Sequence, residues 1–389
     1  MNKHISLPLL LTTLLSGGVG ASATTSCPLG WVCPATPVYS SVIGMWYEPW
    51  WQTPDTHGSV MNWIHPNQMS RFKPLIGFYR SGDSTIIDRQ FTEIKSIGVS
   101  YLILDETNTI ADGDGGLIDK NVQAIFAEDQ RLPASDQLLL SVAIGGQLWA
   151  RKSAAGQDTE ANYIYSSYAS TPVYFSWRGK PLLVSYNYYH ACGGTAFDKN
   201  WDDPRFSVRK ADCVVYPKFG ESSWWGWIVD YPQTMSREAM VVTAGADVAN
   251  ENGMHDGVSS ANINRDNGAY FEKSWLRAIS ENPQTIVING WNEFRDETAI
   301  EPALAIDPTV PAWVDAYGRE TPDWYVQIAT AYANLRVGLI PGGYYRDVNC
   351  TAIYSVAAAR LVVQSVPPHG HPVIPLPAGL LGQLGAPAC

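Results

Sequence analysis

Short runs of apolar residues recur along the chain, and each is long enough to form one buried strand. Eight runs lie between residues 41 and 290: SVIGMW (41–46), PLIGFY (74–79), SYLILD (100–105), QLLLSVAI (137–144), KPLLVSY (180–186), DCVVY (212–216), AMVVTAG (239–245) and QTIVING (284–290). Continuous apolar character without alternation is typical of parallel strands that are covered on both faces. The pattern therefore predicts a parallel sheet of eight strands.

Amphipathic segments with helical periodicity lie among these runs. Residues 83–98 begin with an Asp/Ser pair suited to a helix N-cap and end with a glycine, and residues 267–282 are similar. Residues 322–338 would form a closing helix. Strands that alternate with helices predict an α/β fold of the (β/α)8 TIM barrel type. A doubly wound open sheet is the rival, but no G-x-G-x-x-G motif or P-loop follows the first strand.

The two ends of the chain differ in composition from its middle. Lys3 and a short apolar stretch precede small residues up to Ala23, which is the pattern of a secretory signal peptide. We therefore expect a signal peptide at residues 1–23, a catalytic barrel at 24–338, and a loop-rich tail packed on the barrel at 339–389. Export predicts a secreted or periplasmic protein.

Six cysteines in an exported chain suggest disulfides, although six cysteines allow 15 pairings. Proximity in sequence favours the pairs Cys27–Cys33, Cys192–Cys213 and Cys350–Cys389. The cysteines are scattered, and neither a C-x-x-C nor an H-E-x-x-H motif occurs, so the sequence predicts no metal and no other cofactor.

The charge and the aromatic content of the chain indicate which classes of partner are expected. The 389 residues carry a net charge of −11 without a basic cluster, which argues against nucleic acid as a partner. The signal-like apolar run is too short to cross a membrane, and no later segment is longer, so no membrane partner is expected. About half of the 15 Trp and 20 Tyr should lie in the core. Others are candidate stacking platforms for sugars: Trp46, Tyr47, Trp50, Trp224, Trp225 and Trp227.

Polar groups follow several predicted strands, where a barrel places its chemistry. The candidates are Glu48 after the first strand, Asp105 at the end of the third, Asn187 after the fifth, and Asn292, Glu293, Asp296 and Glu301 after the eighth. Glu293 directly follows an apolar strand, so we expect it to be buried with a raised pKa, which suits acid/base work. Two flanking carboxyls of opposite protonation are what glycoside hydrolysis needs.

Structural roles compete for some of these acids. Asp83 suits a helix cap better than a catalytic role. Arg295 and Glu297 suit an exposed ion pair on a solvated turn, and Glu301, which precedes a proline, could hold a loop. His190 is as well explained by a structural role as by a functional one.

The stretch GWNEFRDETAIEPA (290–303) resembles the WNEWHEGTQIEP signature of the endo-α-mannosidase-like glycoside hydrolases of families 71, 99 and their relatives. The opening VIGMWYEPWW and the segment PLIGFYRSGDSTIIDRQFTEIKSIGVSYLILD are also similar to the family, in the same order, over about residues 40–335. The resemblance implies that Glu293 assists attack by the substrate's own 2-hydroxyl, which gives an anhydro-sugar intermediate. Asp296 would then be the general acid/base.

Two departures from the family pattern bear on that assignment. Asp296 stands where the family has Glu, and Glu297 stands where it has Gly. An aspartate reaches about one methylene less, and small displacements of a proton donor are costly. Three alternatives remain for the general acid/base. Asp296 could act with a shifted backbone, Glu297 could take the role, or Glu293 and Asp105 could form a two-carboxylate site.

These observations predict a secreted glycoside hydrolase that cleaves an α-linked oligo- or polysaccharide, with retention. Glu293, Asp105 and Asp296 are the candidate catalytic residues. A catalytically inactive glycan-binding protein on the same scaffold is the main alternative. A lyase or deacetylase is less favoured, because the His/Asp metal set of a deacetylase is missing from the sequence.

Overall fold

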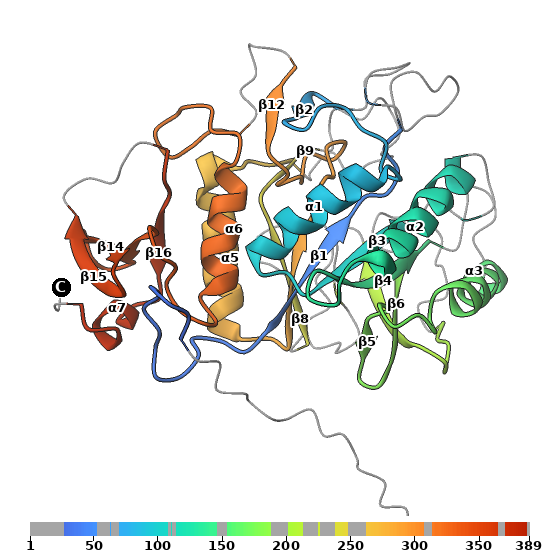
Figure 1. The fold of residues 1–389 in the computed structure, drawn as a ribbon, viewed down its shortest axis with the longest axis horizontal. Helices are drawn as coiled ribbons and strands as arrows, with labels where there is room; N and C mark the ends of the chain where they lie inside the picture. The colour runs from blue at the N-terminus through green and yellow to red at the C-terminus, as the bar shows by residue number, and fades with distance from the viewer. Residues whose placement is uncertain are drawn as a thin grey trace, which may run out of the picture.

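The computed structural model describes residues 27–52, 63, 70–107, 110, 114–145, 154–187, 201–212, 225, 238–247, 262–306, 313–364 and 370–386. Within these residues a parallel sheet forms the centre of the molecule (Figure 1). Its strands are β1 (Val42–Tyr47), β3 (Tyr101–Glu106), β4 (Leu139–Ile144), β6 (Lys180–Asn187), β7 (Ser207–Asp212), β8 (Ala239–Thr243) and β11 (Thr285–Asn289). A short strand β5 (Ser176–Trp177) pairs antiparallel with β6.

The sheet order places the first strand beside the last. The parallel strands run β8-β11-β1-β3-β4-β6-β7, and Met45 of β1 is in register with Leu102 of β3 and Ile288 of β11. Near the outer strands β7 and β8, Arg209 of β7 forms an ion pair of 2.7 Å with Glu238, which directly precedes β8. The α/β class and a curled, barrel-like parallel sheet agree with expectation, but a closed (β/α)8 barrel is not confirmed within the described residues.

One predicted strand is wrong. Residues 74–79 do not join the parallel sheet, because the chain turns there, with a hydrogen bond of 2.9 Å from Gly77 N to Pro74 O and a positive φ of 87° at Gly77. Pro74 instead ends β2 (Phe72–Pro74), which pairs antiparallel with β12 (Ala303–Ala305). The strand expected at 212–216 lies earlier, as β7, and residues 213–216 are outside the described residues.

Helices cover the sheet where the periodicity predicts them. They are α1 (Ser84–Ile97), α2 (Asp114–Arg131), α3 (Ala154–Ser167), α5 (Ala269–Glu281) and α6 (Trp324–Asn334), with a 3-10 turn η2 (Asp266–Gly268) before α5. Helix α1 begins where the Asp83 side chain accepts a hydrogen bond from Thr85 N, and it ends at Gly98 with a φ of 102°. The helices predicted at residues 83–98, 267–282 and 322–338 are confirmed as α1, α5 and α6, each with somewhat shorter bounds, whereas α2 and α3 were not among the predictions.

The two faces of the parallel sheet bury different sets of side chains. Alternate residues such as Leu102 and Ile288 face the helices, whereas Trp46, Tyr101 and Val287 belong to a separate interior cluster. The Tyr101 ring of β3 lies over Gly44 of β1, and its hydroxyl lies 2.8 Å from Thr285 Oγ1 of β11. The two strands on either side of β1 therefore meet through one face, because Gly44 has no side chain to separate them.

The C-terminal segment contains more regular structure than the loop-rich tail that was expected. Strands β13 (Tyr344–Asp347), β14 (Ile353–Ala357), β15 (Arg360–Gln364) and β16 (Val373–Leu376) form a sheet in the order β15-β14-β13-β16, followed by α7 (Leu380–Gln383). The sheet packs on α5 and α6 through β16, and Tyr332 donates a hydrogen bond of 2.8 Å to Pro375 O (Figure 1). The remaining short strands, β9 (Ala246–Asp247) and β10 (Asn262–Ile263), pair with each other.

The cysteine predictions can be compared with the structure in part. Cys27 and Cys33 form the expected disulfide. Cys350 is also disulfide-bonded, but its expected partner Cys389 and the pair Cys192 and Cys213 lie outside the described residues. Residues 1–23, the expected signal peptide, lie outside them too. In the part of the chain that the structure describes, no helix is both long and apolar enough to cross a membrane.

Candidate active site

The sheet order gathers four acids from three neighbouring strands. Glu48 directly follows β1, Asp105 lies in β3 one residue before its end, and Glu293 and Asp296 follow β11. Because β3, β1 and β11 are adjacent and parallel, their carboxyl ends meet at one edge of the sheet. The negative charges of the other three acids all raise the pKa of Glu48, so the four carboxyl groups share one site.

Glu293 is held by its own loop. Its side chain is fully buried, and Oε1 accepts hydrogen bonds from the backbone N–H groups of Arg295 (2.9 Å) and Asp296 (3.0 Å). Oε2 has no hydrogen-bond partner within the described residues. Burial raises the pKa of Glu293, and the nearby charge of Asp296 raises it further. One carboxylate oxygen is thus anchored while the other is available to a bound molecule.

Asn292 ties the first strand to the last. Its Oδ1 accepts a hydrogen bond of 2.8 Å from Glu48 N, and its Nδ2 donates one of 3.0 Å to Glu48 O. The same Nδ2 lies 3.0 Å from the Tyr79 hydroxyl. The Asn292 side chain, predicted to bind substrate, is buried and occupied by these contacts. It fixes the backbone of Glu48 relative to the neighbouring Glu293.

Glu48 has the most unusual environment of the four acids. It is 0% exposed, and neither of its carboxyl oxygens has a hydrogen-bond partner in the described part of the chain. Burial is the main cause of its raised pKa, followed by the charges of Asp105 and Glu293. The side-chain interaction with Asp105 raises the pKa of Glu48 as well, so its surroundings favour the neutral form.

Asp105 and Asp296 differ from Glu48 in their surroundings. Asp105 is 3% exposed, and its Oδ1 accepts a hydrogen bond of 2.8 Å from Thr107 N. Burial raises the pKa of Asp105, whereas the hydrogen bonds from Thr107 oppose that rise. Asp296 lies in the turn at residues 294–297 and is only partly buried. The structure therefore brings all three predicted catalytic residues together and adds Glu48 to them.

Glu297 was expected on an exposed turn, and that expectation is wrong. Its residue is 8% exposed, and Oε1 accepts a hydrogen bond of 2.5 Å from Arg71 Nε. Arg71 comes close because it precedes β2, whose pairing with β12 folds that segment over the loop after β11. Glu297 also has a positive φ of 55°, and its carbonyl accepts a hydrogen bond of 2.6 Å from Arg265 Nη2. Glu297 thus secures the loop.

Glu301 and Tyr47 belong to a second polar network, between β1 and α1. Glu301 accepts hydrogen bonds from the Tyr79 hydroxyl (2.8 Å) and from Gln90 Nε2 (3.0 Å). Tyr47 donates a hydrogen bond of 2.5 Å to Gln90 Oε1. Burial raises the pKa of Glu301 to about 8. These contacts favour the loop-holding role of Glu301 over its predicted contact with substrate.

The predicted aromatic platforms are only partly described. Trp46 and Trp225 are buried in the interior cluster, and Trp225 packs edge-on against Trp177 with ring centroids 5.2 Å apart. Trp50 is buried with an indole N–H that has no partner within the described residues. Trp224 and Trp227 lie outside the described residues, as does the side chain of Asn187 at the end of β6. The sugar-stacking roles stay predictions.

Sequence reasoning missed the groups that support the acidic loop. Trp51 donates a hydrogen bond of 2.9 Å to Asn292 O and stacks on Trp63 at 3.8 Å between ring centroids. The partly buried Arg265 side chain lies 4.1 Å from the Trp313 ring centroid and donates to the carbonyl of Ala299 at 2.8 Å. Apart from the stack of Trp51 on Trp63, these contacts join segments far apart in the sequence, so no local motif predicts them.

Neither a metal centre nor a match to a family model is found. Among the residues that the structure describes, no group of three or more His, Cys, Asp or Glu side chains is placed to hold a metal ion. No protein-family model matches the chain.

Comparison with individual proteins is informative. A rat protein, glycoprotein endo-alpha-1,2-mannosidase, is 20% identical over 374 residues, which cover 76% of this chain and 75% of that protein. The resemblance to the endo-α-mannosidase-like family is confirmed. Two structures of the GH99 endo-alpha-mannosidase from Bacteroides thetaiotaomicron, one in complex with BIS-TRIS propane, share the fold of this endo-α-mannosidase-like chain. Each has a TM-score of 0.52, with 17% and 16% identity, and the match covers 76% of this chain and 96% and 97% of theirs.

Two of the buried acids at this site differ in the hydrogen-bond donors around them. Backbone N–H groups hold one oxygen of Glu293 and partly oppose the rise of its pKa that burial causes. Glu48 lacks such donors within the described residues, which favours its neutral form. Acids with environments that differ in this way can serve as base and acid in one reaction.

Proposed function

We propose that this protein is a glycoside hydrolase that cleaves an α-linked mannoside, with retention of configuration. The observation that carries the proposal is the environment of Glu293. It is a buried acid at the carboxyl end of β11, with one oxygen held by two backbone N–H groups and the other oxygen free within the described residues. The likeness to the rat endo-alpha-1,2-mannosidase supports the choice of an α-mannoside as substrate.

In the proposed reaction, Glu293 accepts the proton of the substrate's 2-hydroxyl while the 2-oxygen attacks the anomeric carbon. The leaving oxygen receives a proton from a second acid of the site. Water then opens the anhydro sugar, so two inversions give overall retention. Asp296 holds the position implied by the family resemblance for the second acid, and Asp105 is the partner in a two-carboxylate alternative.

The finer parts of the sequence predictions belong to the same proposal. Trp50, Trp225 and the side chain of Asn187 would contact the glycan, together with Trp224 and Trp227. The parallel sheet would close into a (β/α)8 barrel between β7 and β8, where the ion pair between Arg209 and Glu238 already joins the two outer strands. We also propose that the protein is secreted or periplasmic.

The test is hydrolysis of α-mannooligosaccharides by the purified protein, measured as the release of reducing ends. The same measurement with α-glucan oligosaccharides serves as the comparison. Glu293→Gln is expected to lower turnover by at least about 10²-fold and to leave the fold intact by circular dichroism. Glu297→Gln is the matched control on the same loop, since Glu297 pairs with Arg71. Near-normal turnover of the Glu293→Gln variant would contradict the proposal.

A catalytically inactive glycan-binding protein is the second candidate. The observation that favours it is the shorter Asp296 at the position where the family resemblance implies a glutamate acid. In that case the unaltered protein binds α-mannooligosaccharides in calorimetry and releases no reducing ends at any pH. Measurable turnover that depends on Glu293 excludes it.

A further inference from the structure

We propose that Glu48 is the proton donor of this site, the residue that protonates the oxygen of the leaving sugar. The inference rests on the proposed function, because it presupposes cleavage of a glycosidic bond beside Glu293. It assigns to the end of the first strand a catalytic role that the sequence pattern gives to Asp296.

The hydrogen-bond donors around the acids indicate which one carries the proton. Glu293 accepts two backbone N–H groups, and Asp105 accepts the N–H of Thr107 at 2.8 Å. Such donors stabilise the ionised form of a carboxyl group. Glu48 is buried and has no such donor within the described residues, so the neutral form is favoured there.

The backbone of Glu48 is fixed relative to Glu293. β1 and β11 are paired in register, with Met45 opposite Ile288, and both acids lie just beyond the ends of these strands. The Asn292 side chain grips both the N–H and the carbonyl of Glu48, and the Ser81 hydroxyl lies 3.3 Å from the same carbonyl. A donor and a base held this way keep a constant separation, which favours proton transfer in a defined geometry.

The other acids near the site are bound by other side chains or are exposed to water. Glu297 forms an ion pair with Arg71, and Glu301 is bound by Tyr79 and Gln90 in the network beside α1. Asp296 is partly exposed in its turn, where water can solvate a carboxylate. Glu48 differs from these acids, because it is fully buried and the group beside its carboxyl is another acid, Asp105.

Charges on the elements packed around Glu48 act in the same direction. Asp105 comes from β3, Glu293 and Asp296 come from the loop after β11, and Tyr47 is its neighbour on β1. Each of the three acids, when ionised, raises the pKa of Glu48, in addition to the larger effect of burial. Burial and the neighbouring charges therefore both favour the neutral form of Glu48.

Glu48 and Glu293 each transfer one proton in each of the two proposed steps. The Glu48 carboxyl gives its proton to the glycosidic oxygen as the bond from that oxygen to the anomeric carbon breaks, and the leaving sugar departs as an alcohol. Glu293 takes the proton of the 2-hydroxyl as the 2-oxygen bonds to the anomeric carbon. In the second step the water oxygen bonds to the anomeric carbon as the bond from that carbon to the 2-oxygen breaks. Glu48 takes a proton from the attacking water, and Glu293 returns its proton to the 2-oxygen.

The experiment compares two substrates in Glu48→Gln: an α-mannooligosaccharide and the corresponding α-mannosyl fluoride. Fluoride leaves without protonation, so loss of the proton donor slows the first step only on the oligosaccharide, and this step is measured as the single-turnover release of the leaving group. We expect release of the leaving sugar to slow at least about 10²-fold, and release of fluoride to stay within about tenfold. Glu293→Gln is the matched control and should lose activity on both substrates.

Two results would overturn the inference. Equal losses on both substrates in Glu48→Gln would mean that Glu48 acts only through structure. A selective loss on the oligosaccharide in Asp296→Asn, with Glu48→Gln active, would assign the donor to Asp296. If Glu48→Gln does not fold, Glu48→Asp keeps a carboxyl group of shorter reach, and the same two substrates are compared.

Failure of the wider proposal gives a different result. If the unaltered protein cleaves neither the oligosaccharide nor the fluoride, the proposed function fails, and the role of Glu48 fails with it. If the unaltered protein is active and Glu293→Gln is inactive, while Glu48→Gln cleaves the oligosaccharide normally, only the assignment of Glu48 is overturned.

Discussion

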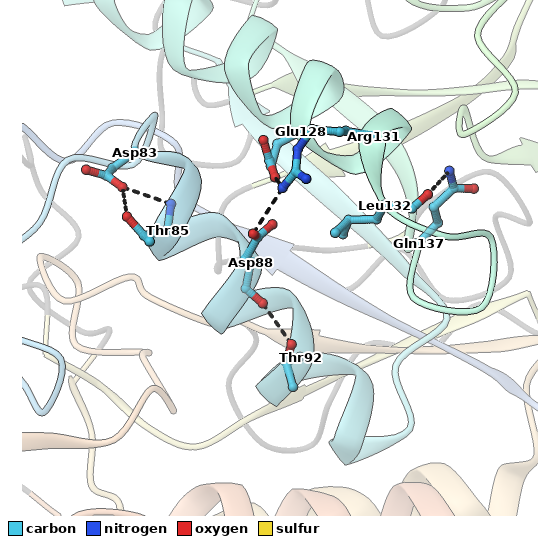
Figure 2. A network of polar contacts seen from close by, with 8 residues as sticks. All are labelled: Asp83, Thr85, Asp88, Thr92, Glu128, Arg131, Leu132 and Gln137. Atoms are coloured by element: carbon cyan, nitrogen blue, oxygen red, sulfur yellow. Dashed lines mark hydrogen bonds and ion pairs between the residues drawn. The ribbon is translucent and has the colours of Figure 1, made fainter.

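Two groups of acids in this molecule show opposite relations to their surroundings. On the surface formed by α1 and α2, each acid has a partner: Asp83 accepts from Thr85 N at 2.9 Å, and Asp88 lies 3.2 Å from Arg131, which also bonds Glu128 (Figure 2). The Arg131 side chain is 62% exposed there. At the ends of β1, β3 and β11, buried acids lie close together, and several of their carboxyl oxygens have no hydrogen-bond donor within the described residues.

The difference shows in the direction of the pKa shifts. Hydrogen bonds from Thr85 lower the pKa of Asp83, and one from Arg131 lowers that of Glu128, although desolvation raises that of Asp88 beside it. Burial raises the pKa of Glu48 well above its ordinary value. A surface acid that caps a helix stabilises the fold by being ionised. A buried acid beside other acids destabilises the fold unless it stays neutral, and such an arrangement is typical of a functional site. The comparison separates acids that serve stability from those that serve chemistry.

The largest effect in the free protein is expected from Asn292→Ala. It leaves the N–H of Glu48 unpaired in a buried place and its carbonyl with the Ser81 hydroxyl alone, so the free energy of unfolding should fall by about 2 kcal/mol or more. Turnover should also fall by about tenfold or more, because Glu48 loses its fixed position. Urea unfolding and steady-state kinetics measure the two effects.

The matched control is Asn334→Ala. The Asn334 amide in α6 donates to the carbonyls of Ile97 and Thr330, away from the acids. It should lower stability and leave turnover per folded molecule unchanged. If Asn292→Ala behaves in the same way, Asn292 has no positioning role.

A smaller, pH-dependent effect is expected from Glu301→Gln. The pKa of Glu301 is about 8 in the folded protein, above its ordinary value of 4.5. Between these values the folded chain binds a proton that the unfolded chain releases, so Glu301 makes stability fall as pH rises through this window. The melting temperature of Glu301→Gln relative to the unaltered protein should therefore rise from pH 5 to pH 8.

Differential scanning fluorimetry across that range measures the difference. Glu281→Gln, at the exposed C-terminal end of α5, should show no such trend. A pH-independent difference for Glu301→Gln would mean that Glu301 is ionised within its network with Tyr79 and Gln90.

The smallest effect is expected on the surface, from Asp83→Ala. Loss of the helix N-cap should lower the free energy of unfolding by about 1 kcal/mol and leave turnover unchanged. Arg131→Gln should have a smaller effect, because its ion pairs with Asp88 and Glu128 are open to water. A change in turnover with either variant would remove the distinction between the two groups of acids.

The sequence allowed prediction of features that depend on local pattern. Helix α1, with its cap at Asp83 and its end at Gly98, follows from residues within one segment. Parallel strands such as β3 and β11 follow from short apolar runs, and their shared orientation predicts that Asp105 and Glu293 meet. These predictions succeed because chain geometry alone relates the residues.

Features that depend on distant partners could not be predicted. Asn292 reads as a polar group beside a catalytic acid, and only the fold reveals that it binds the backbone of Glu48, 244 positions away. Glu297 reads as a surface acid until Arg71, 226 positions away, is seen to cover it. Residues 74–79 have the composition of a strand, but a turn at Gly77 and the pairing of Pro74 with Ala303 prevail.

The pairing of β1 with β11 has a consequence for the synthesis of the chain. Glu48 lies near the start of the described residues, and the strand and loop that complete its site arrive with residues 285–301. A growing chain therefore carries half of the acid cluster, without its partner strand, until most of the protein has been made. Contacts of such long range form slowly. The edge of the sheet that carries the acids should therefore be among the last parts of the molecule to assemble.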